Sequence, residues 1–164
     1  MRILGIDPGY GIIGFGLVEA ERSNFSLLRC GAITTSAGMD FSARLEIIYE
    51  DMRKLLEVAK PDAVAIEELF FGQNVTTGIG VAQARGVILL AIRQAVLDGT
   101  SYKPMQVKQA GGCYGNATKH QVMDMTKRLL HLQAMPKPDD AADAIAIALC
   151  HARSSTSLLS QINR

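Results

Sequence analysis

The first part of the chain is a succession of short apolar runs. Apolar residues dominate positions 2–6, 13–21 and 24–36, and short links that contain glycine or asparagine separate the three runs. Short, partly alternating apolar runs between turn-forming links are typical of strands that follow one another in a sheet. The pattern therefore predicts three strands that pair as an antiparallel meander.

From Asp40 the apolar period changes to three and four residues, which predicts an amphipathic helix that ends at residues 60–61, Lys-Pro. Residues 62–68 form another apolar run ending in acids, and we expect a strand parallel to the first, reached by a helical crossover. The remaining predicted elements are a long, nearly uncharged helix over 75–97, a strand over 100–104, a short helix from 105, a helix over 118–132 with Thr118 as its cap, and a last helix over 139–153. This order predicts an α/β fold with a five-stranded mixed sheet flanked by helices.

The composition is ordinary for one globular domain. The 164 residues are 48% apolar and 20% charged, and the net charge of +1 neither excludes nor indicates a nucleic-acid partner. We expect residues 1–153 to form a single domain and 154–164 to form a flexible tail. The cysteines are far apart and no secretory or membrane-spanning segment is apparent, which predicts reduced thiols and a cytoplasmic location; they are Cys30, Cys113 and Cys150.

A glycine-rich loop near the N-terminus has two interpretations. Gly9, Gly11 and Gly14 have the spacing of a dinucleotide-binding loop. Such a loop leads into a helix whose N-terminus binds the pyrophosphate, whereas a strand-like segment follows here and residues 28–36 contain no acid for a ribose. We therefore interpret the glycines as allowing a tight hairpin and a close approach of backbone or phosphate to Asp7.

Four acids occupy positions that predict a metal site. Asp7 ends the first predicted strand and Glu67 ends the fourth, so adjacent parallel strands would bring both to one edge of the sheet. Asp140 and Asp143 are three residues apart and share one face of the last helix. Clustered carboxylates repel unless a cation neutralises them, and oxygen-only donors favour Mg²⁺ or Mn²⁺, a pair of which can hydrolyse phosphate esters. Each acid taken alone has a second interpretation, as a solvated strand-end or helix-dipole charge.

Six blocks along the chain resemble the RuvC family of Holliday-junction resolvases. They are GIDPG, AIEELFF, AQARG, PMQVKQA, ATKHQV and DDAADAIAIALCHA, in the family's order and spacing. The resemblance implies a ribonuclease-H-like fold and a homodimer that cuts two strands of a four-way DNA junction symmetrically. By position it makes Asp7, Glu67, Asp140 and Asp143 the catalytic acids, with two Mg²⁺ per subunit that Mn²⁺ can replace. It further implies a branch-migration motor and a junction-binding subunit, of the RuvA and RuvB type, as partners.

The resemblance also assigns DNA contacts. Lys108 and Lys119 match basic residues near the scissile strand, where they could hold backbone phosphates. Phe70 matches an aromatic residue that opens or stacks on bases at the crossover. Arg85 and Gln73 are further candidates for phosphate contacts.

One further feature supports the implied homodimer, and another departs from the family pattern. The apolar segment 79–97 suits a two-fold interface, which symmetric cutting requires. Gly111-Gly112-Cys113 replaces a branched apolar pair followed by glycine in the family, and two glycines weaken a helix by about 1 kcal/mol each, so we expect reduced stability or activity. Two alternatives stay open, namely a non-catalytic junction-binding protein, and a ribonuclease or actin-like ATPase that shares the fold.

Overall fold

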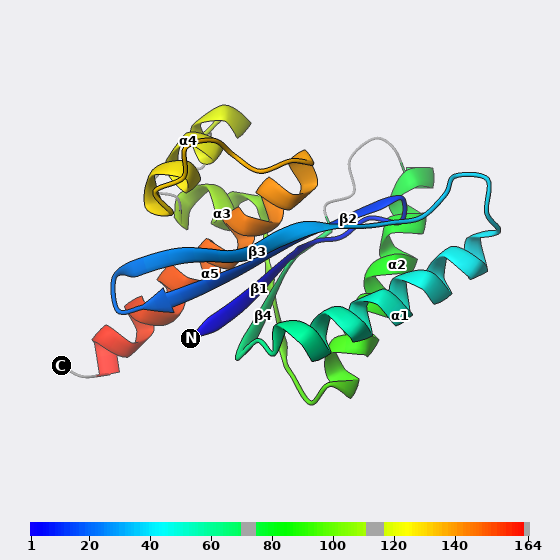
Figure 1. Cartoon of the computed structure of the whole chain (residues 1–164), viewed down its shortest axis with the longest axis horizontal. Coiled ribbons are helices and arrows are strands. Elements are labelled where there is room, and N and C mark those ends of the chain that lie inside the picture. Colours follow the sequence, from blue (N-terminus) through cyan, green and yellow to red (C-terminus); the bar gives the residue numbers. More distant parts are fainter. Residues whose placement is uncertain (70–74, 111–116, 163–164) are drawn as a thin grey trace.

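The computed structural model describes residues 1–69, 75–110 and 117–162. Within these residues, five strands form one sheet in the order β3-β2-β1-β4-β5 (Figure 1). They are β1 (Arg2–Asp7), β2 (Ile12–Glu21), β3 (Asn24–Thr34), β4 (Ala63–Glu67) and β5 (Gly99–Tyr102). The first three pair antiparallel, while β4 lies parallel between β1 and β5, so the predicted meander and the mixed sheet are confirmed.

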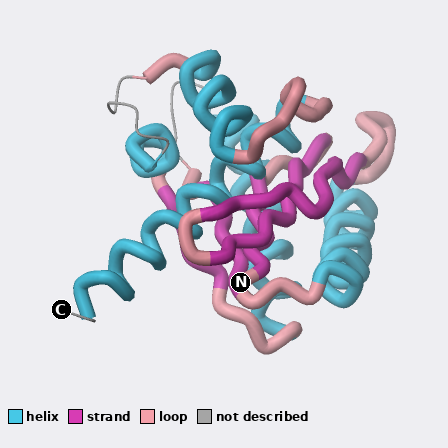
Figure 2. Tube along the Cα trace, turned by 60° about the vertical axis from the view of Figure 1, so that its left-hand side comes forward, coloured by secondary structure: helices cyan, strands magenta, loops and turns pink. Residues whose placement is uncertain are grey.

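Helices cover both faces of the sheet. On one face lie α1 (Phe41–Ala59) and α2 (Val75–Gln94), and on the other lie α3 (Pro104–Ala110), α4 (Lys119–Leu129) and α5 (Asp139–Ile162) (Figures 1 and 2). Thr118 caps α4 as predicted, within a capping box that it forms with Gln121. No helix in the described part of the chain is long and apolar enough to cross a membrane.

The last helix is longer than the sequence pattern predicts. We expected it to end at residue 153, but α5 continues to Ile162 and its C-terminal end projects beyond the sheet (Figure 2). The Ser154 hydroxyl donates a hydrogen bond to the Cys150 carbonyl, and the Ser155 hydroxyl bonds to the carbonyl of His151. Serines whose hydroxyls bond back one turn are compatible with a helix, although their composition is typical of a frayed terminus.

The two faces of β1 contact different helical layers. Ile3 belongs to the core that the sheet shares with α3, α4 and α5, whereas Leu4 and Ile6 belong to the core shared with α1 and α2. Successive side chains of a strand point to opposite faces. The alternation therefore directs Asp7, at the end of β1, to the α5 side of the sheet.

Candidate active site

Asp7 and Glu67 lie side by side at the carboxyl ends of two parallel strands. The register pairs Ile6 of β1 with Ile66 of β4, and each acid is the next residue along its strand. Ala65 packs in the α5-side core, so the alternation of β4 directs Glu67 to the same face as Asp7. Parallel strands that present their carboxyl ends together form the usual ligand edge of an α/β sheet.

The first turns of α5 lie directly on the glycines of β1 and β2. Gly14 pairs with Asp7 across the two strands, and a Cβ atom on Gly14 would lie 1.9 Å from the carbonyl oxygen of Asp140. A Cβ atom on Gly5 would lie 2.0 Å from the carbonyl oxygen of Ala144. The sequence interpretation gave Gly14 a role in allowing the hairpin and a close approach to Asp7. The structure shows that the backbone that approaches at Gly14, within β2, is that of the helix that carries two of the acids.

The pKa of Asp7 responds to each of the other three acids. Burial of Asp7 is the largest cause that raises its pKa from 3.8 to about 7. Three further negative charges raise it more, while the positive charge of Lys119 opposes them; the three are Glu67, Asp143 and Asp140. The structure therefore brings all four predicted acids into one electrostatically coupled group.

Two lysines stand at the same group of acids. Lys119 Nζ, at the start of α4, donates a hydrogen bond of 2.9 Å to Asp143 Oδ2, and this bond is the main cause that raises the Lys119 pKa. Burial and the charge of Asp143 raise the pKa of Glu67, and the charge of Lys108 partly offsets them. Both lysines line a pocket of about 200 Å³ together with Glu67 and Asp143. The structure thus gathers Lys108 and Lys119 with the acids.

The donor set fits a divalent cation, although the side chains do not form a ready cage. Among the described residues, no three carboxylate, imidazole or thiol groups converge closely enough to hold an ion as they lie. Asp143 is instead bound to Lys119, and the acids are near enough to raise the Asp7 pKa by repulsion. A divalent cation would remove that repulsion and draw the carboxylates together, and oxygen-only donors suit Mg²⁺.

The structure does not place every predicted residue in the role that the sequence suggested. Phe70 and Gln73, and the Gly111-Gly112-Cys113 segment, fall outside the described residues. Arg85, which we expected at a DNA phosphate, lies on α2 and donates a hydrogen bond to the backbone carbonyl of Glu67.

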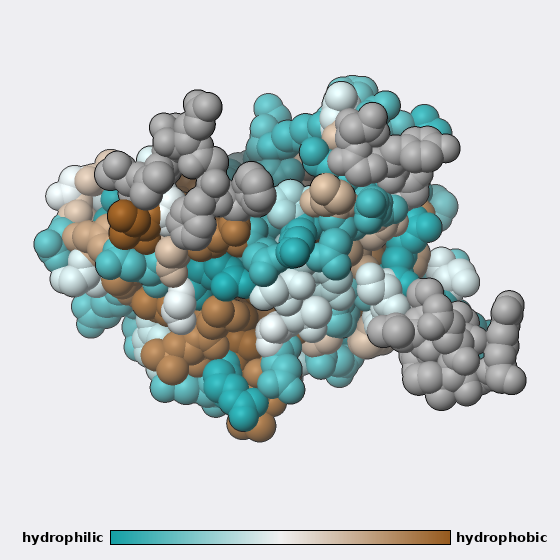
Figure 3. Space-filling view, turned by 180° about the vertical axis from the view of Figure 1, so that it is seen from behind, coloured by the Kyte–Doolittle hydropathy of each residue, from teal (hydrophilic) through white to brown (hydrophobic). Residues whose placement is uncertain are grey.

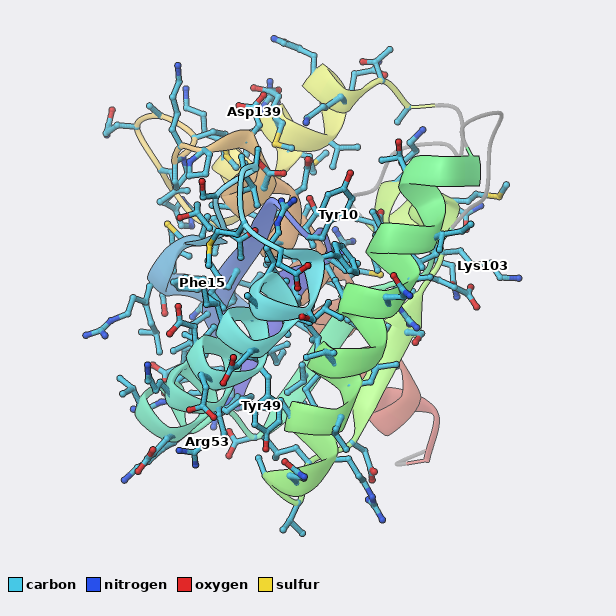
Figure 4. All side chains as sticks on the ribbon, turned by 90° about the vertical axis from the view of Figure 1, so that its right-hand side faces the viewer. Tyr10, Phe15, Tyr49, Arg53, Lys103 and Asp139 are labelled. Atoms are coloured by element: carbon cyan, nitrogen blue, oxygen red, sulfur yellow. The ribbon has the colours of Figure 1, made fainter. Side chains whose placement is uncertain are left out.

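Arg44 supports the site and was missed by the sequence prediction. It is 8% exposed on α1, and its Nη2 atom donates a 3.1 Å hydrogen bond to the carbonyl of Tyr10, in the turn that follows Asp7. Its Nε atom donates to Thr35 Oγ1 at 2.8 Å, and its guanidinium lies over the Tyr10 ring (Figure 4). The available signal was a charged residue four positions before Ile48, on the buried stripe of the helix.

With a chelator present, we expect Asp7 to lower stability as pH rises from about 4 to about 7. Its pKa is about 7 when folded and 3.8 ordinarily, so in this range the folded state holds a proton that the unfolded chain releases. The contribution of protonated Asp7 is fully present below about pH 4 and lost above about pH 7. Melting temperatures of Asp7→Asn and the natural protein should therefore diverge across this range, in favour of the variant. Parallel curves would contradict the assignment.

Comparison with known proteins agrees with this architecture. Residues 3–151 match the sequence model of the family described as crossover junction endodeoxyribonuclease RuvC. The protein of that name from Brevibacillus brevis is 52% identical over 153 residues, which cover 93% of this chain and 92% of the relative. A structure of Thermus thermophilus RuvC superposes with a TM-score of 0.89 at 36% identity. T. thermophilus RuvC in complex with a Holliday junction substrate gives 0.87 at 34%, and both alignments cover 96% of each chain.

These likenesses extend over nearly the whole chain rather than over one motif. The matched segment contains all four acids of the candidate site and, apart from Arg2, all residues of the five strands. The ribonuclease-H-like fold implied by the sequence resemblance is confirmed. By sequence and by fold, the chain belongs to the RuvC family of crossover junction endodeoxyribonucleases.

Proposed function

We propose that this protein resolves four-way DNA junctions as a metal-dependent, structure-selective endonuclease in recombination and repair. The observation that carries the proposal is the gathering of two acids at the carboxyl ends of β1 and β4 with two acids of α5 and two lysines. Such a combination suits hydrolysis of a phosphodiester, because carboxylates can hold cations while lysines hold phosphates.

The four acids are proposed as the catalytic and metal-binding residues. Asp7 is central to the group, since its pKa responds to all three others, and it would be a ligand of the bound cations. Glu67, Asp140 and Asp143 would complete the donor set. Two Mg²⁺ ions per subunit, for which Mn²⁺ can substitute, would supply Lewis acidity and lower the pKa of the attacking water. The products would carry 5′-phosphate and 3′-hydroxyl ends.

The lysines are proposed to hold the scissile strand. Lys119 is half-exposed and neutralises Asp143, so a phosphate arriving at the pocket offers its ammonium group a second anionic partner. Lys108 lines the same pocket from the end of α3. Phe70 stays a sequence-based candidate for stacking on an unpaired base of the junction.

A homodimer is proposed through the exposed face of α2. Ile79 is 54% exposed and Leu90 is 52% exposed, while a Cβ atom on Gly86, between them on the helix, would meet open space. Figure 3 shows apolar side chains gathered on the side of the molecule where α2 lies. A two-fold pair would present two sites to the two strands of a junction. We also propose a cytoplasmic location and partners of the RuvA and RuvB type.

We expect Leu90→Asp to dissociate the dimer, because it places a charge in the proposed apolar contact. Sedimentation should report a monomer, and a cruciform plasmid should be nicked rather than linearised. Val58→Asp is a matched control, since Val58 is 64% exposed but lies on α1 beside the β2–β3 side of the sheet. A Leu90→Asp variant that sediments as a dimer would refute this interface.

Competition tests the substrate class. A labelled four-way junction is incubated with Mg²⁺ and an excess of unlabelled linear duplex of the same sequence. Continued cleavage of the junction supports the proposal, whereas loss of cleavage to the linear competitor would indicate a nuclease without junction selectivity. The salt dependence of junction affinity measured alongside reports the number of phosphates held.

A further inference from the structure

Arg85 connects three elements at the edge of the candidate site. From α2, its Nε atom donates a 3.0 Å hydrogen bond to the carbonyl oxygen of Glu67, the last residue of β4. Its Nη2 atom donates a 2.7 Å hydrogen bond to Ser101 Oγ, on β5. The side chain is half-buried, so two of its three nitrogens are committed to the protein close to one of the four acids.

The peptide unit after Glu67 is held at both ends. Its carbonyl oxygen accepts from Arg85, while its N–H, which belongs to Glu68, donates to the carbonyl oxygen of Tyr102 at 2.8 Å. The pairing of β4 with β5 ends at this point, where Glu67 is opposite Tyr102. Among the described residues, the pairing of β4 with β1 and β5 does not continue past Glu67. Arg85 therefore fixes the backbone carbonyl of Glu67 where the sheet itself stops doing so.

We propose that Arg85 is a positioning residue that orients Glu67 for catalysis and does not bind DNA phosphate. This inference rests on the proposed nuclease function. The planar guanidinium presents donors in a fixed fork, so bonds to a carbonyl and a hydroxyl on adjacent strands define its orientation. Because α2 also carries the proposed dimer face, Arg85 is a direct mechanical connection between that helix and one acid of the site.

Arg85→Ala tests the proposal, because it should change some measured properties of the protein and leave others unchanged. Single-turnover cleavage of a four-way junction should fall about 10- to 100-fold, because small displacements of a catalytic group have effects of this size. Junction affinity without divalent cations, and its salt dependence, should be unchanged. Mn²⁺ binding measured by calorimetry should weaken, since Glu67 would be held less firmly. If Arg85 instead bound a phosphate, the variant would bind the junction more weakly, and the slope of log affinity against log salt concentration would be shallower by about 0.9.

The matched control is Arg53→Ala, which removes the same charge from the neighbouring helix. Arg53 is exposed and is paired with Glu50, one turn away. It lies in the C-terminal half of α1, far from Tyr10 and Asp139 (Figure 4). The cleavage rate, junction affinity and Mn²⁺ binding of the Arg53→Ala variant should match those of the natural protein.

Ser101→Ala decides the matter if Arg85→Ala does not fold. Ser101→Ala removes the hydroxyl that accepts a hydrogen bond from Arg85 Nη2, so the guanidinium is held less firmly. Slower cleavage with unchanged junction affinity would therefore support the positioning role. A natural rate of cleavage in whichever of the two variants folds would overturn it, and so would weaker junction binding with a shallower salt slope. Failure of the natural protein to cut junctions would instead count against the proposed function itself.

Discussion

Asp7→Asn should bind four-way junctions as tightly as the natural protein and cut them at least about 1,000-fold more slowly. The substitution keeps the shape of the side chain but removes the charge that every other acid of the group acts upon. Lost cation binding alone is worth several kcal/mol of transition-state stabilisation, which corresponds to a factor of this size. Junction affinity is measured by gel shift without divalent cations, and cleavage by single-turnover kinetics with Mg²⁺.

Asp139→Asn serves as the control for Asp7→Asn. Asp139 is the first residue of α5 and is adjacent to Asp140, but it matches none of the four proposed acids. As a helix-dipole residue it should affect the cleavage rate only slightly. Natural cleavage by Asp7→Asn, or an equal loss in both variants, would refute the assigned roles.

Gly14→Ala should strongly reduce both stability and cleavage. The new methyl group would lie 1.9 Å from the Asp140 carbonyl oxygen and 2.9 Å from the Ala141 nitrogen, both backbone atoms that no rotamer change can move. We expect a loss of about 1–3 kcal/mol in unfolding free energy from overpacking. A displacement of α5 of about 1 Å also predicts a cleavage rate about 100-fold lower.

Gly38→Ala is the matched control for Gly14→Ala, because nothing lies within 4 Å of its added methyl group. Urea unfolding gives the stability of both variants, and single-turnover kinetics gives their cleavage rates. Gly38→Ala should behave as the natural protein in both assays. If Gly14→Ala kept natural stability and activity, the proposed seat of α5 on β2 would not position the acids.

The acids illustrate a compromise between stability and function. Burial and mutual repulsion raise the Asp7 pKa to about 7, so bringing these carboxylates together opposes folding near neutral pH. Lys119 offsets part of the repulsion through its contact with Asp143. Groups with strongly shifted pKa values concentrate at functional sites, because a structural core would exclude them.

The sequence was sufficient where the information is local. Short continuous apolar runs identified β1 and β4, and the acids at their ends followed from where each run stops. The acids at the start of the last helix allowed its first residue to be predicted correctly. Its end was not predicted, because composition does not reveal the hydrogen bonds from Ser154 and Ser155 to the preceding turn.

The supporting residues could not be predicted because their partners are distant in sequence. Gly14 looked like part of a turn, since its contact with Asp140 exists only once α5 lies on the sheet. Arg85 looked like a surface charge for phosphate, since its acceptor is the main chain of Glu67. Backbone atoms supply both contacts, and no pattern of side-chain types records them.

The proposed nuclease function is tested most directly by single-turnover cleavage of a synthetic four-way junction. A linear duplex of the same sequence is assayed in parallel. We expect paired, symmetric cuts in the junction that leave 5′-phosphate and 3′-hydroxyl ends. These cuts should require Mg²⁺ or Mn²⁺ and should be absent with Asp7→Asn. Tight junction binding with no cleavage at any Mg²⁺ concentration, or equal cleavage of the linear duplex, would contradict the proposed function.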